Sequence, residues 1–173
     1  MVIGSGLVFA SDDEKGERGH KYEHSYYDVA PVNNAQYKEE CGSCHMAFQP
    51  GFLPARSWDK LMSGLEDHFG ESAEMDAVDQ KVLTDYLKEN AADHSNYKKS
   101  RSFNRSVARN AAPLRISEVR YFIKEHDELS RRMVQDNPEV KSFSKCEACH
   151  QSAEQGSYDE DQVYIPGYGR WDD

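Results

Sequence analysis

Apolar residues at helical spacing predict several short helices, separated by polar stretches of chain. The first helix is expected to begin near Asn34 and to run into Cys41. A loop over residues 50–54 follows, because this stretch holds two prolines and a glycine. The second helix takes Ser57 as its N-cap and ends before Gly70. Its apolar stripe is expected to comprise Trp58, Leu61, Met62, Leu65, His68 and Phe69.

Two further helices are predicted downstream, each opened by a capping side chain. The helix after Asp76 ends near Ala92 and is expected to bury a face made of Val78, Val82, Leu83, Tyr86 and Leu87. The helix after Ser117 has an apolar stripe made of Val119, Phe122, Ile123, His126 and Leu129. Between these helices, residues 95–117 show little periodicity and are interpreted as a long connector. With a turn-forming tail at 151–173, the pattern indicates a mainly α fold.

The chain has few of the residues that build a core. Leu, Ile, Val and Phe make up 30 of 173 residues, or 17%, and the net charge is −10, a combination typical of intrinsic disorder. Ten Tyr, two Trp and the periodic helices indicate instead a chain that folds but lacks apolar volume of its own. We therefore expect a large apolar prosthetic group. The negative charge argues against nucleic acid as a partner, and the lack of any 18-residue apolar stretch argues against a transmembrane segment.

All four cysteines of the chain lie in two copies of one motif. Cys41-Gly42-Ser43-Cys44-His45 and Cys146-Glu147-Ala148-Cys149-His150 both have the pattern C-x-x-C-H, the attachment signature of c-type haem. Thiols three positions apart lie on the same side of a helical turn, so both can add to the vinyl groups of one porphyrin. The next residue places an imidazole beside the iron. Two copies that use every cysteine predict two covalently bound haem c groups.

Two other uses of paired cysteines fit the sequence less well. A zinc site built from both pairs would join residues about a hundred positions apart, whereas pairs in zinc ribbons are usually about 15 to 20 residues apart. Such a site also does not require a histidine directly after each pair. A thioredoxin-like redox motif would need a surrounding βαβ pattern, which neither copy has.

The N-terminal residues indicate export. Residues 1–10 are uncharged and mostly apolar, and Val8-Phe9-Ala10 fits the cleavage preference of signal peptidase. This segment is interpreted as the remnant of a signal peptide that starts upstream, with a mature chain beginning near Ser11. Haem attachment to C-x-x-C-H takes place outside the cytoplasm, so a periplasmic location is expected. Residues 11–32 are polar and rich in Tyr and His, and are expected to form an arm.

Charge is distributed unevenly along the chain. Residues 95–117 carry six Lys and Arg and no acidic residue, whereas the rest of the chain has a net charge of −16. These basic side chains are candidates for pairing with haem propionates or with an acidic protein partner. A solvated linker is an equally good interpretation of the same stretch.

Several local sequences together resemble the small periplasmic dihaem cytochromes c. The resemblance is carried by residues 40–45 (ECGSCH), 53–58 (LPARSW), 65–70 (LEDHFG), 85–87 (DYL) and His126 ahead of the second motif. It covers about residues 37–150 and is more specific in the first half. The family implies an N-terminal half similar to a class I cytochrome c, a C-terminal half that wraps irregularly around the second haem, and two His ligands for each iron.

The resemblance also implies a role and partners. Members donate electrons to an oxygen-binding, high-spin monohaem c-type cytochrome, and a membrane cytochrome b is the expected upstream donor. We therefore expect an electron-transfer protein and not an enzyme, as a monomer or weak dimer. A small peroxidase-like dihaem enzyme, which needs an iron that loses a ligand, and a haem-based sensor are the alternatives.

Each iron needs one ligand besides the histidine of its motif. The predicted ligands are four histidines, two from the motifs and two from apolar faces of predicted helices: His45, His150, His68 and His126. A metal bond would satisfy an imidazole that is otherwise costly to bury. Met75 is the rival of His68, because class I cytochromes commonly take a Met from the loop before the last helix. His94 is the third candidate.

These inferences divide the chain into four parts. They are a signal remnant at 1–10, a polar arm at 11–32, a class I cytochrome c-like haem domain at 33–94, and a second, irregular haem-wrapping unit with the basic connector at 95–173. With both axial positions of each iron filled by protein, electron transfer is favoured over chemistry on oxygen, peroxide or nitrite. Both potentials are expected to lie below that of a Met/His cytochrome.

Overall fold

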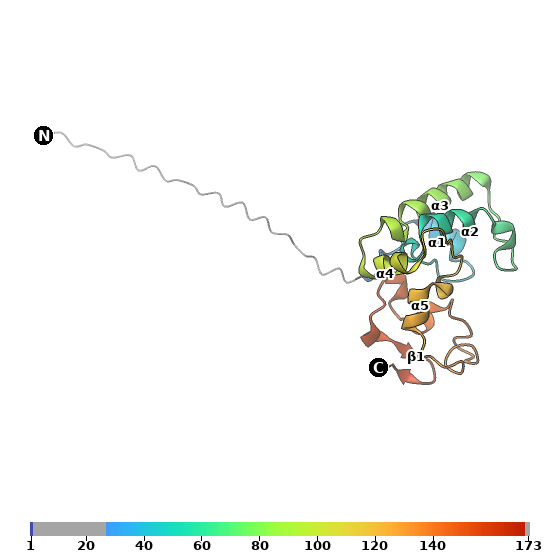
Figure 1. The fold of residues 1–173 in the computed structure, drawn as a ribbon, viewed down its shortest axis with the longest axis vertical. Helices are drawn as coiled ribbons and strands as arrows, with labels where there is room; N and C mark the ends of the chain where they lie inside the picture. Colours follow the sequence, from blue (N-terminus) through green and yellow to red (C-terminus); the bar gives the residue numbers. More distant parts are fainter. Residues whose placement is uncertain (2–26, 172–173) are drawn as a thin grey trace.

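The described part of the chain, Met1 and residues 27–171 of a computed structural model, is mainly helical, as the sequence predicts (Figure 1). The α-helices are α1 (Ala35–Cys41), α2 (Ala55–Met62), α3 (Ala77–Glu89), α4 (Lys98–Ser106) and α5 (Arg120–Glu125). Single 3₁₀ turns lie at Pro50–Phe52 (η1), Leu65–Asp67 (η2), Ala92–His94 (η3), Ile116–Glu118 (η4), Cys146–Ala148 (η5), Ala153–Gln155 (η6) and Glu160–Gln162 (η7). Strands β1 (Tyr164–Ile165) and β2 (Gly169–Arg170) form an antiparallel hairpin.

Side-chain caps confirm two of the predicted helix starts. The Asn34 side chain accepts a hydrogen bond of 2.9 Å from the backbone N–H of Tyr37 at the start of α1. The Asp76 carboxylate accepts one of 2.8 Å from the N–H of Val78 at the start of α3. Each cap satisfies a donor that the first turn of a helix leaves without a partner. Because α1 ends at Cys41, the first cysteine motif begins on the last residue of a helix.

Helix α2 begins earlier and ends sooner than its sequence indicates. Its N-cap is Pro54, and Ser57 lies inside the helix with a fully buried side chain, so the prediction of Ser57 as the cap is wrong. Proline suits this position because it has no N–H to satisfy. The helix ends at Met62, and η2 follows. His68 therefore comes after the turn η2 and does not lie on a helical stripe.

Helix α3 buries a narrower face than predicted. Leu83 and Leu87 are buried and the helix packs mainly against α2, whereas Val78 and Val82 are 70% and 47% exposed. Successive residues of a helix are about 100° apart around its axis. A helix that packs on one neighbour therefore buries Leu83 at the expense of Val82, and the prediction of both valines as core residues is wrong.

Part of the stretch interpreted as a connector is the helix α4. It buries Ser100 and Phe103 and packs on η1, η3 and α5. Lys98, Arg101 and Arg105 are exposed on this helix. The buried contact of the helix is too short to give a visible apolar period. The connector interpretation is thus wrong for residues 98–106, while residues 107–115 have no helix or strand.

The helix predicted after Ser117 starts later and is shorter. Ser117 lies within η4 and caps nothing, and α5 begins after Val119. Six residues make less than two turns. Phe122 is the buried residue of this helix, whereas Ile123 is 53% exposed. His126 stands directly after the helix, at its C-cap.

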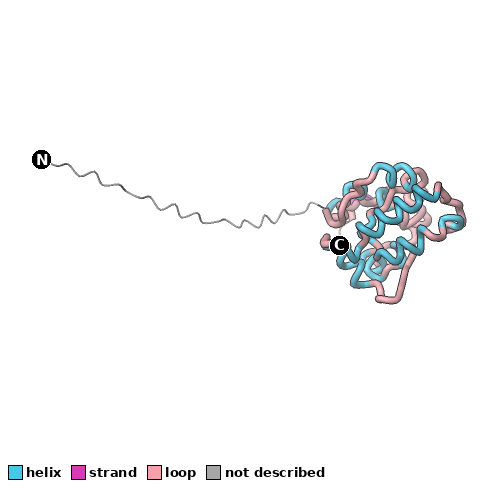
Figure 2. Tube along the Cα trace, turned by 90° about the horizontal axis from the view of Figure 1, so that it is seen from above, coloured by secondary structure: helices cyan, strands magenta, loops and turns pink. Residues whose placement is uncertain are grey.

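Residues from distant parts of the chain share one hydrophobic core. The Phe52 ring packs edge-on against Phe103 and Tyr158, with ring centres 5.0 Å and 5.1 Å away. In Figure 1, α4 and α5 lie between α1–α3 and the C-terminal segment. Figure 2 shows the helices side by side with loops running over them. The expected boundary between residues 94 and 95 stays a prediction about separate folding units.

The expected N-terminal parts fall mostly outside the described residues. This holds for the signal remnant beyond Met1 and for residues 11–26 of the arm. At the end of the arm, Val29 and Val32 are buried in the core. Within residues 27–171, no helix has the length and apolar character needed to cross a membrane.

Gly156 joins the C-terminal segment to the residues before α1. Its carbonyl oxygen accepts hydrogen bonds of 2.9 Å and 3.1 Å from the N–H groups of Asp28 and Val29. Its φ of +81° lies in the left-handed region that favours glycine. A Cβ at this position would also collide with the carbonyl oxygen of Val29. Glycine is therefore the residue that fits this junction.

Replacing Gly156 by Ala should lower the free energy of unfolding by more than the roughly 1–2 kcal/mol typical of a left-handed non-glycine residue. The excess arises because the new methyl group must displace the Val29 backbone. Gly167→Ala is the matched control, since its φ is +76° but a Cβ there meets nothing within 4 Å. Urea unfolding of the intact protein measures both. Equal losses in the two variants would contradict the role of the junction.

Candidate haem sites

The first motif begins at the end of α1. Cys41 is half-buried, whereas Cys44 is exposed. Burial, with a smaller effect of the neighbouring Glu40, raises the pKa of the Cys41 thiol to about 11. The Nδ1 of His45 lies 2.8 Å from the carbonyl oxygen of Met46. A carbonyl only accepts, so Nδ1 carries the proton and Nε2 is the nitrogen that can bind a metal.

His68 faces His45. Their ring centres are 6.2 Å apart and their ring planes differ by 23°. Phe48 stacks on the His45 ring at 4.8 Å and helps to fix its orientation. Burial, followed by His45 and Arg115, lowers the pKa of His68 and so favours the neutral imidazole that binds metals. The structure thus brings together the two histidines predicted for the first iron, although His68 reaches there from a loop.

The second motif is held by the C-terminal segment. Within the motif, the N–H of His150 donates to the Cys146 carbonyl at 2.8 Å. The N–H of Tyr164, on β1, donates to the Cys149 carbonyl at 3.1 Å. Burial, with the adjacent Glu147 carboxylate, raises the pKa of the Cys146 thiol to about 12. The C-terminal segment, which the sequence predicts only to form turns, therefore packs against the second motif and hydrogen-bonds to it.

His126 faces His150 across the second site. Their ring centres are 6.1 Å apart, and their planes differ by 70°. The Nδ1 of His126 donates to the Phe122 carbonyl at 2.9 Å, and its ring stacks on the Phe122 ring at 3.9 Å. Both contacts come from the residue four positions earlier and fix the imidazole orientation.

Burial favours the neutral form of both histidines at the second site. Burial, with added effects of His126 and Lys99, lowers the pKa of His150 to about 4. Burial also lowers the pKa of His126, which outweighs the opposite effect of its bond to the Phe122 carbonyl. The Nδ1 of His150 is buried and has no hydrogen-bond partner within the described residues.

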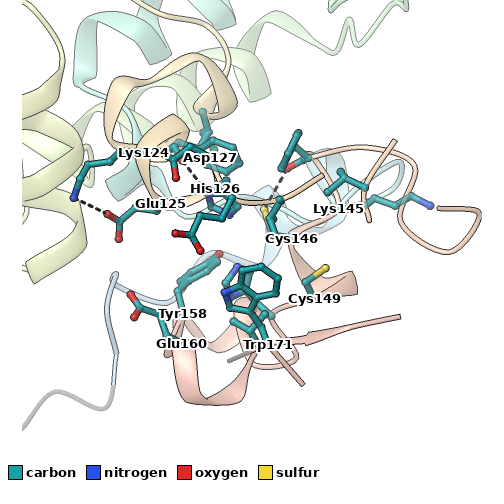
Figure 3. A pocket seen from close by; sticks show the side chains of 18 of the residues that line it. Lys124, Glu125, His126, Asp127, Lys145, Cys146, Cys149, Tyr158, Glu160 and Trp171 are labelled. Carbon is teal, nitrogen blue, oxygen red and sulfur yellow. Dashed lines mark hydrogen bonds and ion pairs between the residues drawn. The ribbon is translucent and has the colours of Figure 1, made fainter. Parts of the chain in front are cut away.

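A cavity of about 300 Å³ is lined by both histidines of the second site. Figure 3 shows His126 on one side, Tyr158 and Trp171 across from it, and Cys146 and Cys149 beside the space. Its aromatic lining comprises Phe52, Phe103, Tyr121, Phe122, Phe143, Tyr158 and Trp171. Charged lining residues are Lys99, Lys124, Lys145, Glu125, Asp127, Glu128 and Glu160. An apolar interior with a few charged groups is typical of a site for a large prosthetic group.

The donor sets of both sites fit a haem c group. Two imidazoles bound to opposite sides of one metal ion, each through a bond of about 2 Å, have ring centres about 6 Å apart. The measured separations are 6.2 Å and 6.1 Å. His45 and His150 each directly follow the second of two thiols that attachment requires, and Cys146, Cys149, His126 and His150 line one cavity at the second site. The assignment of the four histidines as ligands stays a prediction that this geometry supports.

The competing ligands and metals fit less well. His94 is exposed at the end of η3, and its Nδ1 donates to the Lys88 carbonyl at 2.8 Å. Met75 packs against the core and stays a rival for the first iron. The four thiols are free. In the part of the chain that the structure describes, no three His, Cys, Asp or Glu residues gather into a group that could hold a metal ion.

The basic stretch divides into parts with different surroundings. Lys99 lines the second cavity. On α4, Lys98, Arg101 and Arg105 are exposed. Arg115 instead lies over the ring of Phe69, with its guanidinium carbon 3.7 Å from the ring centre. The basic residues of this stretch therefore do not all belong to a solvated linker.

The sequence gives no sign of the buried contact that links the two sites. Gln49, four residues after His45, is fully buried. Its Oε1 accepts a hydrogen bond of 2.7 Å from the Tyr158 hydroxyl, and its Nε2 donates to the Ala153 carbonyl at 2.6 Å. The Tyr158 ring lies 5.2 Å from the His150 ring. A pairing between residues 109 positions apart leaves no local pattern, so only covariation among relatives could have shown it.

Known proteins resemble this chain over most of its length. A family model for dihaem cytochrome c matches residues 37–158. A solved diheme cytochrome type c from Shewanella baltica OS155 is 45% identical, with a TM-score of 0.67, and the match covers 80% of this chain and 98% of that one. A diheme cytochrome c from Rhodobacter sphaeroides is 40% identical, with a TM-score of 0.67, over 75% of this chain and 100% of that one. No curated protein matches.

The stability of the protein should fall as pH rises above about 10. Burial raises the pKa of Tyr158 far above the value of about 10 of an exposed tyrosine, and raises the pKa of Tyr121 to about 12. The unfolded chain then releases these protons while the folded chain retains them, which favours unfolding at high pH.

Tyr158→Phe should flatten this fall, because one titrating group is removed, and the exposed Tyr168→Phe is the matched control. The free energy of unfolding in urea, measured from about pH 8 to about pH 11, tests it. If the free energy of unfolding falls with pH equally steeply in Tyr158→Phe and in the wild type, Tyr158 is not held in its neutral form.

Proposed function

Because this chain belongs to the dihaem cytochrome c family, we propose that it is a periplasmic electron-transfer protein whose two haem irons are each ligated by two histidines. Family membership implies two haem c groups, for whose attachment the cysteine pairs Cys41/Cys44 and Cys146/Cys149 are present. Each haem supplies an iron that alternates between the ferric and ferrous states. His45 and His68 are the proposed ligands at the first site, and His150 and His126 at the second.

The observation that carries this proposal is the pairing of imidazoles about 6 Å apart at both sites. Four protein ligands for two irons leave no open coordination position for oxygen or peroxide. Electron transfer needs no such position, whereas a peroxidase or a gas sensor does. The aromatic and aliphatic residues around the second site exclude water and so contribute to tuning its potential. Without a thioether ligand, both potentials should lie below that of a Met/His cytochrome.

Donor and acceptor are proposed from the family resemblance. One electron is taken from a reduced membrane cytochrome b, and one electron is passed to an oxidised monohaem c-type cytochrome, with no bond made or broken. Such complexes are small and transient, so complementary charge controls their rates more than buried area does. The proposed state of the protein itself is a monomer or weak dimer in the periplasm.

Two surfaces of opposite sign are available for these partners. The acidic surface near His68 comprises Glu66, Asp67, Glu71, Glu74, Asp76 and Asp79. The basic surface is the exposed face of α4, with Lys98, Arg101 and Arg105, none of which has an ion pair within the described chain. The acidic surface lies by the first site, and α4 contributes Lys99 and Phe103 to the second cavity. We therefore assign entry and exit of electrons to different haems.

His126→Ala should open the second iron and produce a high-spin ferric signal in the visible and paramagnetic resonance spectra. The reason is that its ring is the one that faces His150. His94→Ala is the matched control, because His94 is exposed and should leave both spectra unchanged. A low-spin spectrum in His126→Ala would overturn the ligand assignment. A high-spin fraction or fast cyanide binding in the wild-type protein would instead favour the peroxidase-like alternative.

Reversing Lys98, Lys99 and Arg101 to Glu should slow electron transfer to an acidic monohaem cytochrome c and reduce the dependence of its rate on salt. The wild-type rate should itself fall as ionic strength approaches physiological values, where the screening length is about 8 Å. A triple reversal of Lys38, Lys60 and Lys81 changes the net charge equally on α1, α2 and α3 and is the control. Stopped-flow rates and redox titrations together separate the cases.

Three outcomes of that experiment are distinct. A changed salt dependence with unaltered potentials supports docking on α4. Shifted potentials with an unaltered salt dependence would show that the basic side chains pair with haem propionates instead. No change in either quantity would leave these residues as a solvated surface and contradict the assignment of this face to a partner.

A further inference from the structure

His68 begins a tight turn at the surface. Its N–H donates to the Glu71 carbonyl at 2.7 Å, and the N–H of Gly70 donates to the Asp67 carboxylate at 2.9 Å. These bonds shape the turn but do not connect it to α1, at whose last residue the first motif begins. A further contact is therefore needed to fix the His68 ring relative to His45.

Phe69, the next residue, has an unfavourable backbone conformation. Its φ of +60° lies in the left-handed region, which a residue with a bulky side chain adopts only when its surroundings hold it there. Phe69 is 44% exposed, so burial in the core does not supply the compensation. The ring centre lies 4.7 Å from that of His68.

The compensating contact comes from Arg115, about fifty residues further along the chain. Its guanidinium carbon lies 3.7 Å from the centre of the Phe69 ring, well inside the range of a cation–π interaction. The side chain also has a long ion pair of 3.6 Å with Glu118, which leaves the guanidinium over the ring. Arg115 thus packs on the neighbour of the proposed ligand and not on the ligand itself.

The segment that carries Arg115 is itself tied down. Arg56, on α2, donates from Nε to the Ala111 carbonyl at 2.6 Å and from Nη2 to the Ala108 carbonyl at 3.0 Å. Ile116, directly after Arg115, packs against the hydrophobic core. A segment without helix or strand is therefore held at both ends, and Arg115 has a defined position relative to α2.

We propose that Arg115 and Phe69 are positioning residues, which hold the His68 ring toward His45 and so set how readily the sixth ligand of the first iron leaves. The proposal rests on the ligation by His68 given above. It assigns one of the six basic residues between 95 and 117 a role that is neither propionate pairing nor docking.

Cyanide binding to the intact ferric protein tests the proposal, because cyanide reaches the first iron only after His68 has left. Arg115→Ala and Phe69→Ala should each accelerate binding at the first haem by about 2- to 5-fold, the range that the strength of exposed cation–π pairs implies. The double variant should be no faster than Phe69→Ala, since Arg115 acts through the ring that this substitution removes. The low-spin paramagnetic signal of the first haem should change shape, and that of the second should not.

Arg109→Ala is the matched control, since it removes the same charge from an exposed position of the same segment. His68→Ala identifies the spectrum of cyanide on the first haem and tests the ligation on which the proposal rests. If His68→Ala is high-spin but Arg115→Ala binds cyanide at the rate of Arg109→Ala, only the positioning role fails. Additive effects in the double variant would also overturn it. If His68→Ala stays low-spin, both the ligation and the positioning role fail.

Discussion

At each site two imidazole rings face each other at a fixed distance, and the rest of this structure depends on that constraint. An iron with two histidine ligands needs ring centres about 6 Å apart, and neither pair is produced by local sequence: His45 pairs with His68 and His126 with His150. In each pair, one ring is fixed by a hydrogen bond from Nδ1 to a backbone carbonyl, of Met46 or of Phe122. The partner ring relies on its surroundings, which are the Phe69 turn at the first site and Tyr158 at the second.

The chain has few aliphatic residues, and it meets this constraint through buried contacts that connect the two sites. Gln49 lies just after the first motif yet hydrogen-bonds Tyr158, which packs on the second motif. Gly156 ties the same C-terminal segment to the residues before α1. The core is therefore continuous across both haem sites, and a change at one site is expected to reach the other through packed side chains and buried hydrogen bonds.

The features that the sequence predicts well are the local ones. The two C-x-x-C-H motifs need only neighbouring residues, and the caps at Asn34 and Asp76 need only their own first turn. The errors concern tertiary packing. Val82 is as apolar as Leu83, and only the position of α2 decides which is buried. Helix α4 has too short an apolar contact to give a period, and His68 is moved off its predicted helix by the early end of α2. The pairing of Gln49 with Tyr158 has no local signal at all.

Paramagnetic resonance of the fully oxidised wild-type protein, combined with near-infrared spectra, tests the central claim most directly. The account predicts two low-spin haems, both with histidine as the sixth ligand. Their signals should differ, because the ligand planes differ by 23° at the first site and by 70° at the second, which changes the splitting of the iron orbitals. A methionine signature at the first haem, or a high-spin signal at either, would contradict the assignment of four histidines to two irons.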